Sequence, residues 1–110
     1  MKINDIELDI DFTDADQIER IEKGADKVRS TINSEKPKEM SMAEFIRQEC
    51  QIMRDFFDEA FGEGTSEKIF GNKYSLNMCI SAFQQIIEAK LAQQDELDKI
   101  ISKYSPERLK

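Results

Sequence analysis

The sequence predicts a mainly α domain of three to four helices, preceded by a short N-terminal β-hairpin or strand. Apolar residues recur at helical spacing over most of the 110 residues, and a short alternating stretch comes before them. Hydrophobic residues make up 39% of the chain and charged residues 35%, which is a globular composition. The length suits a single domain over residues 1–110.

Residues 1–12 are expected to form the strand or hairpin. The stretch IELDIDF, residues 6–12, alternates apolar and acidic side chains, which is the period of a half-buried strand. Residues 1–3 are placed to pair back through an Asn4-Asp5 turn. Because a lone hairpin is marginal in water, it must pack on the helices or join a strand of a partner.

Residues 13–33 are expected to form the first helix, with Thr13 as its N-cap. Its apolar positions follow one another at spacings of three and four, which marks a narrow seam. They are Ile18, Ile21, Ala25, Val28 and Ile32. Gly24 weakens the middle of this helix by about 1 kcal/mol relative to alanine. The seam favours a helix laid on the core, and an intermolecular seam is the alternative.

Residues 34–40, which contain Pro37, are expected to form a loop, and residues 41–104 the helical core. Ser41 and Glu44 have the spacing of a capping box at the start of the next helix. That helix presents a wide aromatic face, and Gly62 is placed to end it.

The glycine-rich stretch GEGTS, residues 62–66, raises the possibility of a phosphate-binding loop. Such loops follow a strand and need closely spaced glycines, whereas these glycines follow a predicted helix. Gly62 as a helix end, with Thr65 or Ser66 as the cap of a short helical turn, accounts for the stretch. We therefore interpret it as a corner between helices.

The last helix is expected to run from Ser75 to about Tyr104, with residues 105–110 as a tail. Apolar residues recur along it, and they include Leu76, Cys79, Ile80, Phe83, Ile86, Ile87, Leu91, Leu97, Ile100, Ile101 and Tyr104. The stretch 92–96 is polar all round, which predicts that the helix projects from the core or breaks there.

Charge and residue types argue against several functional classes. Sixteen basic and 23 acidic residues give a net charge of −7, which disfavours nucleic acid and membrane surfaces as partners. There is no histidine, and Cys50 and Cys79 form no CxxC motif, so we expect no metal site, no cofactor and no catalytic centre. The N-terminus resembles no signal peptide, and no apolar run has the length of a membrane span. We therefore expect a cytoplasmic protein.

The phenylalanine cluster is the remaining feature that could bind something. Core packing is the favoured interpretation, with a binding patch as the alternative, since adjacent rings cannot all point the same way. The candidate partner contacts are Phe57, Phe61 and Phe70, followed by Ile18, Ile21 and Val28 of the first helix.

Two strings resemble a known family. FFDEAFGEGTSEKIFG at 56–71, followed by SLNMCISAFQQII at 75–87, and the opening MKINDIELDIDF are similar to small proteins of phages of Gram-positive hosts, encoded among the tail genes. Asp5 stands where the resemblance leads us to expect glycine. Members are described as tail assembly chaperones, which implies a non-enzymatic role in the host cytoplasm.

The resemblance implies that the chain binds the tape-measure protein and, in an assembly step, the tail-tube protein. An apolar helical face would suit a helical client, and the negative charge would keep the complex in solution. The alternative is a structural tail component or self-associating connector without chaperone activity. Under that alternative the chain forms homo-oligomers through the first helix or the strand edge.

Overall fold

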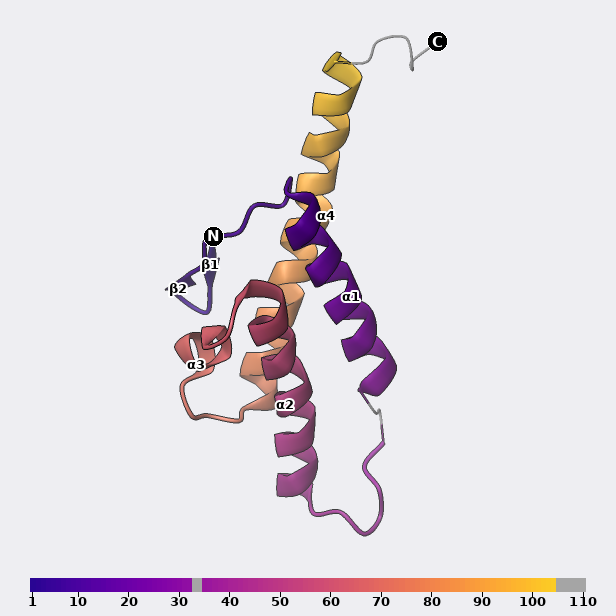
Figure 1. Ribbon diagram of the computed structural model, residues 1–110. Coiled ribbons are helices and arrows are strands. Elements are labelled where there is room, and N and C mark those ends of the chain that lie inside the picture. Colours follow the sequence, from indigo (N-terminus) through magenta and orange to yellow (C-terminus); the bar gives the residue numbers. More distant parts are fainter. Residues whose placement is uncertain (33–34, 105–110) are drawn as a thin grey trace.

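The structure is a computed structural model that describes residues 1–32 and 35–104 (Figure 1). In this part of the chain a two-stranded hairpin precedes four helices, as expected from the sequence. The elements are β1 (Lys2–Ile3), β2 (Ile6–Glu7), α1 (Ala15–Thr31), α2 (Met42–Phe61), α3 (Thr65–Phe70) and α4 (Leu76–Tyr104). The molecule is elongated, with extents of 59 × 28 × 19 Å, because one end of α4 leaves the helical body.

The predicted hairpin turn is confirmed at Asn4-Asp5. These residues have φ values of 49° and 68°, and a two-residue turn of the type I′ class needs positive φ at both positions. Asn4 also fixes the hairpin to α4. Its Nδ2 donates to the Met78 carbonyl at 3.3 Å, and its Oδ1 accepts from Gln85 Nε2 at 3.1 Å.

The strand is much shorter than the predicted stretch 6–12. Pairing ends with reciprocal bonds between Met1 and Leu8, so residues 9–12 are not part of the two-stranded sheet. The alternation still matches burial: Leu8 is buried and Phe12 half-buried, while Asp9 and Asp11 are exposed. The pattern therefore predicted which side chains face the core. It did not predict where the pairing of the two strands ends.

Helix α1 begins one residue later than the predicted N-cap implies. Asp14, and not Thr13, is the N-cap, since Asp14 Oδ2 accepts from the Gln17 amide at 2.9 Å. Thr13 instead donates its amide and hydroxyl to Asp11 Oδ1. The helix ends at Thr31, and residue 33 of the predicted range lies outside the described residues.

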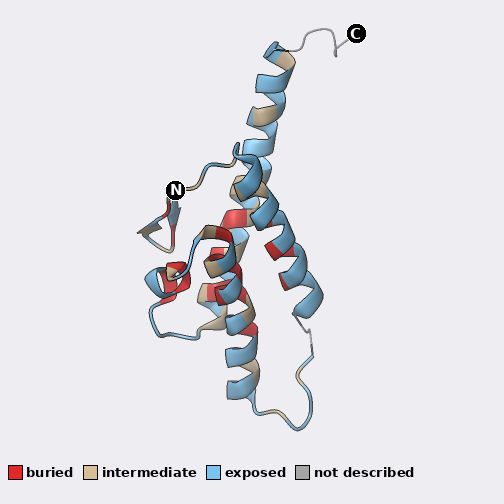
Figure 2. Cartoon of the chain, viewed as in Figure 1, coloured by how far each residue is buried: buried red, intermediate tan, exposed pale blue. Residues whose placement is uncertain are grey.

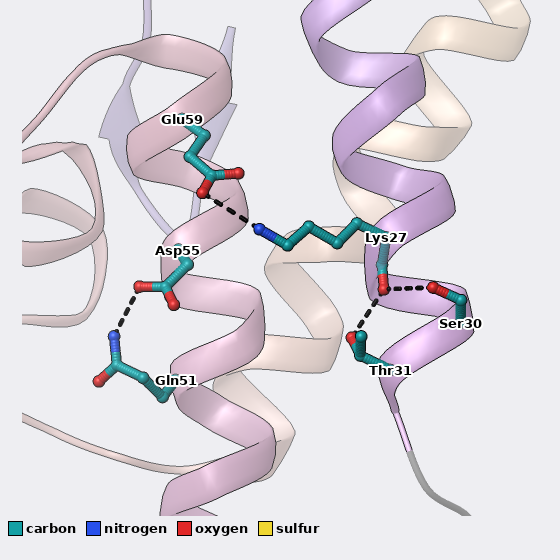
Figure 3. Close-up of polar contacts among 6 residues, drawn as sticks. All are labelled: Lys27, Ser30, Thr31, Gln51, Asp55 and Glu59. Atoms are coloured by element: carbon teal, nitrogen blue, oxygen red, sulfur yellow. Dashed lines mark hydrogen bonds and ion pairs between the residues drawn. The ribbon is translucent and has the colours of Figure 1, made fainter.

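The seam of α1 packs on α2, as the favoured interpretation required. Ile21, Ala25 and Val28 are no more than 3% exposed. Gly24 lies so close to α2 that a Cβ there would be 2.7 Å from Phe56 Cδ1. At the surface, Lys27 Nζ reaches Glu59 Oε1 at 3.5 Å, which joins the two helices along their exposed edge (Figure 3).

The corner between α2 and α3 is confirmed, but its capping differs from the prediction. Gly62 ends α2 with a φ of 112°, and Gly64 is the N-cap of α3, with a φ of 92°. The side chain of Asp58 accepts from both the amide and the hydroxyl of Ser66, at 2.8 and 3.0 Å. The carboxylate of Asp58, on the last turn of α2, thus accepts the hydrogen bonds at the start of α3. We expected Thr65 or Ser66 to do this as the cap.

At the start of α2, Ser41 Oγ accepts from the Glu44 amide at 3.1 Å, as predicted. Helix α4 begins at Leu76 and runs without a break to Tyr104, so the polar stretch 92–96 projects and does not interrupt it. The buried residues gather where α2 meets α1, α3 and the first part of α4, and the far part of α4 is exposed (Figure 2).

Candidate functional site on the projecting helix

Four of the six predicted contact residues lie in the core. Phe57 and Ile21 are 0% exposed, and Phe70 and Val28 are 3% exposed. In this fold their side chains offer no surface to another molecule, which agrees with the favoured interpretation of core packing and not with the alternative of a binding patch. Phe61 and Ile18 are half-buried. The structure brings the three phenylalanines together, and Ile18 shares a groove with Phe12 and Leu97.

The aromatic cluster serves packing. Phe56 contacts Phe57 and Phe83 edge-on, with ring centroids 5.2 and 5.0 Å apart, and Phe57 contacts Phe70 in the same way at 5.6 Å. Edge-to-face pairs are the favoured geometry of buried rings. Phe56 and Phe57 therefore both reach the core, because α1, α3 and α4 cover different sides of α2.

Arg54 is a buried cation that holds the connection from α3 to α4. Its guanidinium donates to the carbonyls of Gly71 and Lys73, at 2.8 and 3.1 Å. It also lies 4.7 Å from the centroid of the Tyr74 ring, as in a cation–π contact. With its donors directed at the backbone, Arg54 acts as a clamp for a turn that precedes α4.

The two cysteines face each other between α2 and α4. Cys50 and Cys79 are both 0% exposed, and both are free cysteines. Burial raises the pKa of both thiols, that of Cys79 to about 12, so neither is a thiolate near neutral pH. They behave as small core residues.

Four of the nine exposed large apolar residues of the described chain lie instead on the part of α4 that leaves the body. We call residues 91–104 the distal half of α4 and residues 76–90 the proximal half. In the distal half only Leu97 and Ser102 are half-buried, and the other residues are exposed. Four side chains share one side of this half and are named here the distal seam: Leu97, Ile100, Ile101 and Tyr104.

The distal seam is exposed although its residues are large and apolar, a kind that is usually buried. Ile100 and Ile101 are 47% and 42% exposed, and Tyr104 is 76% exposed. Large apolar side chains that lie together on a surface mark places where another chain binds. The signal was present in the sequence as periodic apolar residues after a polar stretch. The same pattern is typical of a helix face that packs on a core, so by itself it does not identify these residues as contacts.

A groove leads from the distal seam to the start of α1. It has a volume of about 220 Å³, and its apolar walls are Phe12, Ile18 and Leu97. Its polar walls are Glu22, Lys90, Gln94 and Asp98. Lys90 Nζ pairs with Glu22 Oε2 at 3.4 Å, which ties α1 to α4 at the floor of the groove. Ile18, a predicted contact, therefore lies beside the distal seam.

No group of three or more Cys, Asp or Glu side chains in residues 1–32 and 35–104 is placed to hold a metal ion. Nor does any helix in these ranges combine the length and the apolar character that crossing a membrane requires.

Comparison with known proteins identifies a family but no characterised relative. No curated protein and no solved structure matches the chain. A family model described as a family of unknown function, DUF6673, matches residues 4–110. This match covers β2 and all four helices of the described chain, and β1 precedes it. The protein belongs to the DUF6673 family.

Proposed function

We propose that this chain is a non-enzymatic, tail assembly chaperone-like protein that binds a helical segment of a phage tape-measure protein. The observation that carries the proposal is the distal seam, an apolar stripe on a helix that has left the core. An amphipathic client helix could lie along this stripe with its own apolar residues spaced three and four apart.

Charge and shape support the same proposal. The net charge of −7 keeps an apolar surface in solution and suits a client with basic flanks. The groove at the base of the distal seam gives a client side chain a place to anchor, with Phe12 and Ile18 as its walls. The similarity of the strings at 1–12, 56–71 and 75–87 to phage tail proteins supplies the identity of the client.

The test is co-expression with the tape-measure protein encoded in the same tail cluster. We expect the client to be soluble with the wild-type chain and insoluble without it. Ile101→Asp should abolish this effect, because it places a charge in the middle of the distal seam. Ile80→Asp is the matched control, since Ile80 lies on the proximal half of α4 and is 40% exposed, close to the 42% of Ile101.

Equal solubility of the client with and without the chain would contradict the proposal. Equal loss of activity in the Ile101→Asp and Ile80→Asp variants would show that the distal seam is not the contact. Circular dichroism on both variants checks that the helices remain. Ile101→Ala provides a milder change if the aspartate unfolds the end of α4.

A structural tail component or self-associating connector is the second candidate. The specific observation in its favour is that an apolar stripe on a projecting helix can pair with itself as well as with a client. The predicted self-association through the seam of α1 is less suitable, because Ile21 of that seam is buried in the core and 0% exposed. Ile21→Asp should therefore unfold the domain and not merely dissociate an oligomer.

A further inference from the structure

We propose that the distal half of α4 pairs with the distal half of a second copy of this chain, in an antiparallel and two-fold symmetric arrangement. The inference goes beyond the proposed function, because it needs no client. The occupant of the distal seam in the isolated protein would be the same seam of another molecule.

The first argument is that the distal half needs cover. A helix of roughly 12–15 residues without tertiary packing is marginal in water. From Leu91 to Tyr104 all residues except Leu97 and Ser102 are exposed, yet apolar side chains recur on one side. A second helix laid on the distal seam would remove these side chains from water and stabilise the helix at the same time.

The second argument is the order of charges along the distal half. Acidic residues come first, at Asp95, Glu96 and Asp98, and basic residues follow, at Lys99 and Lys103. In a parallel pair each charge would lie beside its own copy, which is repulsive. In an antiparallel pair the acidic part of one helix lies beside the basic part of the other. The sequence therefore favours the antiparallel orientation with a second copy.

The third argument is the register. Gln94, Leu97, Ile101 and Tyr104 follow one another at spacings of three, four and three, which is the seam of a coiled coil. When two such helices cross antiparallel near Lys99, Ile101 lies over Leu97 of the second copy. In the same register Glu96 lies within one residue of the level of Lys103 of the second copy, and symmetry makes this pair twice.

The groove fits this register. Tyr104 of the second copy lies level with Gln94, which is a wall of the groove together with Phe12 and Ile18. Tyr104 is the most exposed large apolar residue of the described chain, at 76%. Its ring would enter a groove with apolar walls, and its hydroxyl would remain near the polar ones. Because the arrangement is symmetric, both grooves are filled and the assembly closes as a dimer.

The contact is small, so the dimer should be weak. It involves two to three turns of each helix and one groove per copy, which places it among interfaces of low area. We expect a dissociation constant on the order of 10–100 µM. A purified chain should therefore change from monomer to dimer over an accessible concentration range.

Sedimentation equilibrium on the full chain alone, over this concentration range, is the experiment. We expect reversible dimerisation of the wild type and of Ile80→Asp. Ile101→Asp should weaken it at least about a hundredfold, since an unpaired charge would be buried in the contact. A wild type that stays monomeric at the highest concentration, or an Ile101→Asp variant as dimeric as the wild type, would overturn the proposal.

Charge reversal tests the antiparallel register separately. Lys103→Glu and Glu96→Lys each place like charges opposite each other twice, and each should weaken the dimer by about tenfold. The double variant exchanges the charges and should return to the affinity of the wild type. If the double variant is weaker than either single one, the antiparallel pairing is wrong. Since a parallel pair cannot be rescued in this way, the result also decides the orientation.

The distal seam would then be covered by a second copy until a client displaces it. The two proposals remain separable, because the sedimentation experiment contains no tape-measure protein. A wild type that binds the client but does not dimerise would reject only the proposed pairing of two copies. A dimer that does not solubilise the client would reject only the chaperone role.

Discussion

The two halves of α4 have a similar apolar periodicity and opposite surroundings. In the proximal half, Cys79, Ala82 and Ile86 are 0% exposed, because α2 and the hairpin cover them. In the distal half, Ile100, Ile101 and Tyr104 continue the pattern without such cover in the described chain. Figure 2 shows the change along one continuous helix, from buried residues near the body to exposed ones toward its end.

The difference shows that periodic apolar residues determine which face of a helix is apolar. They do not determine whether another element packs on that face. The face is set locally, by the 3.6-residue turn of the helix. Its cover depends on how far the neighbouring elements reach, and α4 is 29 residues long whereas α2 is 20. The longer helix therefore runs past the helix on which it packs.

The largest expected effect contrasts Ile86 with Ile101. Ile86→Ala should lower the free energy of unfolding by about 2–5 kcal/mol, because it leaves a cavity among fully buried neighbours. Urea unfolding followed by circular dichroism measures the change. A loss below about 1 kcal/mol would mean that the proximal half is not packed as described.

Gly24→Ala should destabilise the protein although alanine favours helices by about 1 kcal/mol. The new Cβ would lie 2.7 Å from Phe56 Cδ1, and the Phe56 ring is held by Phe57 and Phe83. Overpacking of this kind costs about 1–3 kcal/mol, so after the helix gain of about 1 kcal/mol a net loss of up to roughly 2 kcal/mol is expected. Lys23→Ala, at an exposed neighbour, is the control. A stabilised Gly24→Ala variant would contradict the close approach of α1 and α2.

High pH should weaken the covered half of α4 through its thiol. The pKa of Cys79 is raised from 9.0 to about 12, mainly by burial. The unfolded chain releases this proton above pH 9 while the folded chain retains it. The stabilisation is therefore complete below pH 9 and is lost as pH rises toward 12, by at most about 1.4 kcal/mol per pH unit.

Unfolding of the wild type and of Cys79→Ala, compared between pH 8 and 11, isolates the contribution of this thiol from the titration of lysines and tyrosines. We expect the wild type to lose more stability over this interval than the variant. Parallel pH profiles of the two proteins would show that the thiol is not buried in solution.

The smallest expected effect on stability is that of Ile101→Ala. At concentrations where the chain is monomeric, the free energy of unfolding should change by less than about 0.5 kcal/mol, as for other exposed positions. A loss comparable to that of Ile86→Ala would show that the distal seam belongs to the core.

Most of the helical fold could be predicted from the sequence, because it depends on local signals. The capping pair Ser41 and Glu44 and the apolar spacing of α1 and α4 act within a few residues. The limits of the strand and the cap of α3 could not. They depend on contacts with residues of other elements. One example is the side chain of Asp58 in α2, which accepts hydrogen bonds from Ser66 in α3.

The candidate site was predicted only in part, for a related reason. Counting along the chain left both core packing and a binding patch open for Phe57 and Phe70, and α1, α3 and α4 together bury them. Ile101 and Tyr104 look like core residues by the same counting. Exposure depends on the three-dimensional reach of other elements, which apolar periodicity does not encode.

Hydrogen exchange along α4, recorded on the purified chain at increasing protein concentration, tests the central claim most directly. The account predicts strong protection of residues 79–90 at every concentration. It predicts fast exchange of residues 94–104 in dilute solution, slowing as copies associate. Uniform protection of both halves in dilute solution would contradict the claim that the distal seam is a surface for another helix.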